Sequence, residues 1–238
     1  MPKELGPLST RPEVDAFLTE VQDHVPSIGP GRGGPGRLLF GMDATASRER
    51  TWDQACHIQW ELFEVTNDIG GLQVSLCHYG GHERFFHTGW FTRAGPLQEH
   101  MARVKCRGGL TQIAKVLAHL RTEARRSPID ALVFVGDAVE EDVDELCHIA
   151  GELGLLGIPA FMFQEGTDKI AMTAFEQIAN LSGGVYCRFG SGSAAGLRSL
   201  LTGVAVYAAG GRKALVEFDR RRGGALEPLL RQLGRNGF

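Results

Sequence analysis

The chain has 238 residues, 43% of them hydrophobic and 22% charged, which is the composition of a globular domain with a substantial core. Its formal net charge is −3, so no overall positive field points to a nucleic-acid-binding protein. No run of about 18 apolar residues predicts insertion into a membrane. The N-terminus carries no apolar stretch typical of a secretory signal, and the five cysteines lie far apart. These features predict a cytoplasmic protein with reduced thiols.

The first 35 residues are expected to form a helix followed by a linker. Apolar residues recur at helical spacing between residues 13 and 25. A run rich in glycine and proline over residues 26–36 then predicts a flexible connection. Because these glycines precede a strand, and because no Gly-Lys-Ser or Gly-Lys-Thr ending follows them, the run is not typical of a phosphate-binding loop.

Strands and helices alternate from residue 36 to residue 209, which we expect to be the main domain. The expected strands are residues 38–42, 72–79, 83–91, 131–135, 159–164 and 184–189. The expected helices are residues 50–66, 96–104, 110–125, 143–155, 171–181 and 194–208. This succession predicts a doubly wound α/β fold, in which helices cover both faces of a mostly parallel sheet with one antiparallel edge hairpin.

The C-terminal extension, residues 210–238, has a less regular pattern. Residues 214–218 are compatible with either a helix or a strand. Residues 226–233 predict a short amphipathic helix, because their apolar positions recur at helical spacing.

Polar side chains follow the first strand and surround the apolar strand 131–135. They are Asp43, Thr45 and Ser47 after the first strand, Thr111 at the start of the helix 110–125, and Asp137 directly after the apolar strand. Each one alone is also a common turn or cap residue. Ligands of such sheets bind beyond the carboxyl ends of the strands, where these residues are expected to meet. Carboxylate and hydroxyl oxygens together suit a hard divalent cation.

This arrangement resembles the metal-ion-dependent adhesion site of the von Willebrand factor A (VWA) family. The family motif is Asp-x-Ser-x-Ser after the first strand, then a distant Thr, then an Asp after a buried strand. The resemblance covers about residues 36–209 and uses all five polar residues in the family's order. Thr45 stands where the family most often has Ser and keeps the hydroxyl, whereas Ala138 follows Asp137 where many members have Gly.

The resemblance implies that Asp43, Thr45, Ser47, Thr111 and Asp137 bind Mg²⁺ or Mn²⁺ in preference to Ca²⁺. The hydroxyl oxygens of Thr45 and Ser47, and in some members of the family the one at the position of Thr111, would ligate directly, and the two aspartates would act partly through bound waters. A cation with few carboxylate ligands attracts an acidic residue from a partner protein. We therefore expect an intracellular, cation-dependent protein-binding module with an adaptor or assembly role, and not an enzyme.

Three alternatives stay open at this stage. The acidic run from Asp137 to Asp142 resembles a motif of haloacid-dehalogenase-like, Mg²⁺-dependent phosphohydrolases, with Asp43 as the nucleophile. That chemistry requires a second Asp two residues after the nucleophile, where this chain has Thr45. A second alternative is a scaffold that does not use its metal site. The third is a zinc site, which would need the hairpin histidines His78, His82 and His87.

Overall fold

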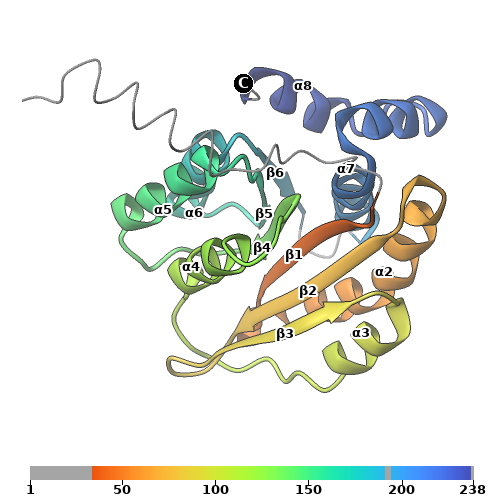
Figure 1. Cartoon of the computed structure of the whole chain (residues 1–238). Coiled ribbons are helices and arrows are strands. Elements are labelled where there is room, and N and C mark those ends of the chain that lie inside the picture. Colours follow the sequence, from red (N-terminus) through yellow and green to blue (C-terminus); the bar gives the residue numbers. More distant parts are fainter. Residues whose placement is uncertain (1–33, 191–193, 237–238) are drawn as a thin grey trace, which may run out of the picture.

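A six-stranded sheet forms the centre of the structure, a computed structural model that describes residues 34–190 and 194–236 (Figure 1). The strands are β1 (Gly36–Asp43), β2 (Leu72–Tyr79), β3 (Phe85–Phe91), β4 (Ala131–Gly136), β5 (Ala160–Glu165) and β6 (Val185–Phe189). Their order is β3-β2-β1-β4-β5-β6, and only the β2–β3 pair is antiparallel among them. The expected fold class is confirmed. The helix expected over residues 13–25 lies outside the described residues.

Helices pack against both faces of this sheet (Figure 1). One face is covered by α2 (Glu49–Thr66), α3 (Ala94–Met101), α7 (Ala194–Arg221) and α8 (Glu227–Asn236). The other is covered by α4 (Ile113–Ala124), α5 (Val143–Leu155) and α6 (Lys169–Ser182). Two short 3-10 helices, η1 (Ala46–Arg48) and η2 (Asn67–Ile69), flank α2. None of the described helices combines the length and the apolar character needed to cross a membrane.

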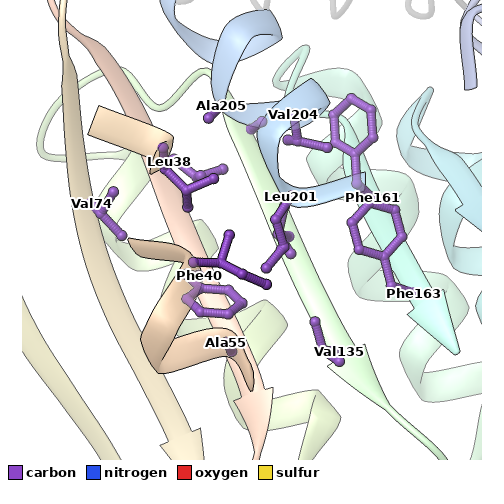
Figure 2. Packing of buried hydrophobic residues seen from close by; sticks show 14 of the residues in the cluster. Leu38, Phe40, Ala55, Val74, Val135, Phe161, Phe163, Leu201, Val204 and Ala205 are labelled. Carbon is purple, nitrogen blue, oxygen red and sulfur yellow. The ribbon is translucent and has the colours of Figure 1, made fainter. Parts of the chain in front are cut away.

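The core is divided into two clusters, one on each face of the sheet. Leu38 and Phe40 of β1 belong to the cluster under α2 and α7, whereas Leu39 belongs to the cluster under α4, α5 and α6. This division follows from the strand period of two, which sends successive side chains to opposite faces. Figure 2 shows Leu38 and Phe40 packed toward Leu201 and Val204 of α7. The strands that carry the candidate site are therefore held from both sides.

Several boundaries near the candidate site differ from the sequence-based expectation. The first strand, expected to end at residue 42, includes Asp43 as its last residue. The strand expected to begin at residue 83 begins at Phe85, because Glu83 adopts a left-handed conformation with φ of 52° that interrupts a strand. The helix expected to begin at residue 110 begins at Ile113. Thr111 therefore lies in the loop that precedes α4 and not on the helix itself.

The C-terminal extension packs onto the sheet. Residues 214–218 are helical, as the second part of α7, which breaks at Gly211 where φ is 70°. In α8 the Gln232 side chain accepts a hydrogen bond from the Tyr186 N–H of β6 at 3.1 Å and donates one to the Tyr186 carbonyl at 2.9 Å. Leu229 of α8 is buried in the cluster shared with α7. These contacts place the extension within the same core as the main domain.

Candidate metal centre

The candidate site lies where the chain connections of the sheet change direction. From β1 the sheet continues to β2 on one side, and β4 lies on the other side. Asp43 is the last residue of β1, and Asp137 follows the last residue of β4. Because β1 and β4 are parallel neighbours, both residues are at the same edge of the sheet. A switch point of this kind is where doubly wound sheets bind their ligands.

A chain of hydrogen bonds connects four of the five expected residues. The Thr45 N–H donates to Oδ1 of Asp43 at 2.7 Å, and the Thr45 and Ser47 hydroxyl oxygens are 3.2 Å apart. The Ser47 hydroxyl donates to Oδ2 of Asp137 at 3.1 Å, which joins the loop after β1 to the loop after β4. Asp43 and Thr45 are buried and Ser47 is exposed, so the group extends from the core to the surface.

The electrostatic environment leaves the buried Asp43 carboxylate poorly stabilised. The pKa of Asp43 is raised to about 6, mainly by burial and in smaller part by the nearby charge of Asp137, which together outweigh the lowering by its hydrogen bonds with Thr45 and by the charge of Arg48. A cation bound beside the two carboxylates would stabilise their charged forms. The pKa shift is thus consistent with a position that a metal ion completes.

Thr111 is held against the loop that carries Asp137. Its hydroxyl oxygen accepts a hydrogen bond from the Glu140 N–H at 3.0 Å, and its own N–H donates to Oε2 of Glu140 at 2.9 Å. The neighbouring Glu141 carboxylate accepts from the Ile113 and Ala114 N–H groups at the start of α4. These hydrogen bonds fix the two loops to each other. Direct ligation by Thr111 stays a prediction.

Two charged residues of the site were missed by the sequence analysis, namely Arg48 and Glu165. The Arg48 guanidinium is buried, with Nη2 at 3.3 Å from Oδ2 of Asp137 and Nη1 bonded to the Glu165 carboxylate. The Thr51 hydroxyl donates to the same carboxylate. The available signals were that Arg48 directly follows Ser47 and that Glu165 ends a buried strand. The positive charge of Arg48 is therefore held beside Asp137, which is also a candidate metal ligand.

The candidate donor set consists of oxygen atoms. Within the described residues, no group of three or more His, Cys, Asp or Glu side chains is placed to hold a metal ion. The candidate set has instead two carboxylates and three hydroxyls, which are the oxygen donors that Mg²⁺ prefers. Arg48 would compete with a bound cation for Asp137, because its guanidinium already contacts the Asp137 oxygen that accepts the hydrogen bond from Ser47.

The hairpin histidines do not converge on a zinc position. His78 is opposite Phe86 and stacks on its ring, with the ring centroids 5.1 Å apart. His87 is opposite Cys77, one position along the strand pair, and stacks on His119 of α4. Successive positions of a strand face opposite sides, so His78 and His87 point away from each other.

Comparison with known proteins assigns the fold. No family model and no curated protein matches the sequence. Similar solved structures include "von Willebrand factor type A from Catenulispora acidiphila" (14% identity, TM-score 0.56, 74% of this chain and 43% of that one). The "SpRpn10 VWA domain" matches with 13% identity and TM-score 0.56, over 71% of this chain and 95% of that one. The mussel byssus protein PTMP1, solved "with zinc occupied MIDAS motif", matches with 13% identity and TM-score 0.55, over 72% of this chain and 46% of that one.

The chain therefore has the fold of a VWA domain. It spans less than half of the Catenulispora and mussel proteins and nearly all of the SpRpn10 domain, so the likeness is to a domain within larger proteins. At these identities the likeness defines the class of fold, and function has to be argued from the site.

Proposed function

We propose that this VWA-type module binds a protein partner through a divalent cation, Mg²⁺ or Mn²⁺, in an adaptor or complex-assembly role. The observation that carries the proposal is the chain of hydrogen bonds from Asp43 through Thr45 and Ser47 to Asp137 at the switch point of the sheet. When bound, the cation would supply a Lewis-acidic position that accepts a carboxylate from the partner.

Each residue of the site would have its own role in binding the cation and the partner. Asp43 would supply negative charge from the core, and the exposed Ser47 would offer its hydroxyl at the surface where a partner approaches. Arg48 orients Asp137 from the side through the contact at 3.3 Å. The paired backbone and side-chain hydrogen bonds of Thr111 with Glu140 keep the third loop in place. The arrangement is thus preorganised before any partner binds.

We propose binding rather than phosphoryl transfer because of the residue two positions after Asp43. A phosphohydrolase of the kind considered above needs a carboxyl group there as general acid and base. Thr45 supplies only a hydroxyl, which lies 3.2 Å from the Ser47 hydroxyl oxygen. Hydrolysis of an aryl phosphate that is lost in Asp43→Asn would contradict this choice.

Calorimetric titration of Mg²⁺ and of Mn²⁺ tests the metal site directly. Asp43→Asn removes the charge and keeps an acceptor for the Thr45 N–H, so the variant should fold at least as stably as the wild type. We expect the heat of binding to be lost in Asp43→Asn and kept in Asp68→Asn, an exposed carboxylate of η2 at the other end of β2. Equal heats from the wild type and Asp43→Asn would refute the metal site.

Affinity capture in Mg²⁺ and in a chelator tests the role of the metal in partner binding. A partner that is retained only in Mg²⁺, and is lost with Asp137→Ala, is the expected result. Retention of the same partner in the chelator would favour the scaffold alternative, in which the fold binds without its metal.

A further inference from the structure

A cavity of about 390 Å³ opens beside the loop that follows β1 and carries Thr45 and Ser47, here called the candidate metal loop, and lies between the β2–β3 hairpin and the segment that follows α3. We call it the basic cavity. Its lining contains four cationic side chains and no acidic one, although the chain as a whole has a net charge of −3. The cationic residues are Arg84, Arg103, Lys105 and Arg107.

The protein itself does little to neutralise these cations. Arg103 lies 3.9 Å from Glu99, but both side chains are largely exposed, so their attraction is weak. Arg84, Lys105 and Arg107 are exposed and form no ion pair with any residue of the described ranges. Like charges gathered around a concave surface raise the local concentration of anions.

The cavity also has an aromatic wall. Phe86 is 48% exposed there and stacks on the buried His78, whose ring in turn packs edge-on against Trp52 at 5.2 Å. An exposed phenyl ring supported from below offers apolar surface to the methylene groups of a ligand. Charged rim and apolar wall together suit acidic side chains carried on a peptide better than a bare inorganic anion.

Backbone contacts join the basic cavity to the candidate metal loop. The Arg107 N–H donates to the Ala44 carbonyl at 2.9 Å, and the Gly81 N–H donates to the Arg107 carbonyl at 3.1 Å. A Cβ at Gly80 would lie 2.5 Å from the Ala44 carbonyl oxygen, so this close approach requires glycine. Since Ala44 stands between Asp43 and Thr45, a partner that brings an acid to the metal also brings its neighbouring residues to the cavity.

We propose that the basic cavity binds an acidic segment of the protein partner, with Asp or Glu side chains paired to Arg84, Lys105 and Arg107. This inference adds to the proposed function. It rests on that function only for the second contact, in which one acidic side chain of the partner binds the metal. The contact at the cavity itself needs no metal. The module therefore selects a cluster of acids over a single acid.

Fluorescence anisotropy of the full chain with a labelled Gly-Glu-Asp-Glu-Asp-Gly peptide tests the inference, in Mg²⁺ and in EDTA. We expect the acidic peptide to bind in both solutions, more tightly in Mg²⁺, and the neutral Gly-Gln-Asn-Gln-Asn-Gly peptide to bind in neither. Lys105→Ala/Arg107→Ala should weaken binding about tenfold in both solutions, because two exposed charge pairs are lost. The matched control Arg212→Ala/Lys213→Ala, which removes two exposed cations of α7, should bind like the wild type.

The outcomes separate this inference from the proposed function. Equal binding in Mg²⁺ and EDTA that is lost in Lys105→Ala/Arg107→Ala would support the basic cavity and contradict the role of the metal. Metal-dependent binding that is unchanged in this double variant would overturn the cavity and support the role of the metal. Inorganic phosphate that displaces the peptide at equal concentration would also overturn the inference, in favour of a small-anion site. Circular dichroism verifies that each variant is folded.

Discussion

The loop after β1, which carries the candidate metal ligands Thr45 and Ser47, adjoins the basic cavity at one end of the sheet, but charged side chains have different roles in the two regions. In the loop, the Arg48 guanidinium is buried and shared between Asp137 and Glu165. Around the cavity, Lys105 and Arg107 are exposed and form no ion pair with another described residue. Charge in the first region is thus used to hold the loops together, whereas charge in the second is available to a ligand. Substitution of the buried charges of the first region should therefore affect stability, whereas substitution of the exposed cations of the second should affect binding.

The largest expected effect is on stability, from Arg48→Met. This substitution leaves the Glu165 carboxylate buried without its counter-charge, at a cost of about 3–5 kcal/mol of unfolding free energy. Arg48→Met/Glu165→Gln should recover much of this loss, because it removes both charges and keeps an acceptor for the Thr51 hydroxyl. Urea unfolding measures both variants. A cost below about 1 kcal/mol for Arg48→Met would mean that the buried pair does not hold the loop.

The next effect comes from His78 in the wall of the cavity. Burial, and the nearby charge of His100, lower the pKa of His78 from 6.5 to about 4. The unfolded chain therefore binds this proton first, so stability is lost as the pH falls from about 6.5 to about 4, by about 3 kcal/mol in total. In His78→Gln this part of the pH dependence should disappear from urea unfolding measured at pH 7, 5.5 and 4.5. A stability curve that is parallel to that of the wild type would contradict the prediction.

A smaller effect on stability, but a clear one on metal binding, is expected for Ser47→Ala. Ser47 is exposed, so the loss of its hydrogen bond to Asp137 should cost at most about 1 kcal/mol. Its hydroxyl is also a proposed ligand, so Mg²⁺ affinity in calorimetry should fall by about tenfold or more. Thr45→Ser keeps the hydroxyl and serves as the control, with an unchanged affinity. Equal Mg²⁺ affinities for Ser47→Ala and the wild type would exclude Ser47 from the site.

The smallest effect on stability is expected at the basic cavity. Lys105→Ala/Arg107→Ala changes exposed side chains and should alter the unfolding free energy by less than about 0.5 kcal/mol. Urea unfolding of this double variant beside Arg48→Met tests the contrast between the two regions. A loss above about 1 kcal/mol would show that these cations stabilise the fold.

Much of the fold followed from local patterns. The strand over residues 72–79 and the helix over residues 143–155 have the bounds that their apolar periodicity predicts. The wholly apolar run in β4 correctly indicated a strand buried on both faces. Periodicity and turn residues act over a few positions, so they can be read without knowledge of distant contacts.

The candidate site was predicted only where its residues follow the strands. Asp43, Thr45 and Ser47 lie at or after the end of β1 and Asp137 follows β4, so the parallel sheet predicted that they share one edge, whereas their contact depends on β1 and β4 being neighbours. The contact of Thr111 with Glu140 required the loop conformation before α4, which no local pattern encodes.

The sequence by itself determined the α/β class and the oxygen-rich set of residues at one edge of the sheet. Only the tertiary structure decided which charged residues lie next to one another. Arg48 and Glu165 are 117 positions apart, and they meet because β5 ends beside the loop after β1. The basic cavity likewise combines Ala44 with residues of the hairpin and of the segment after α3. Such pairs depend on the packing of loops from distant parts of the chain, and neither propensity nor spacing reports that packing.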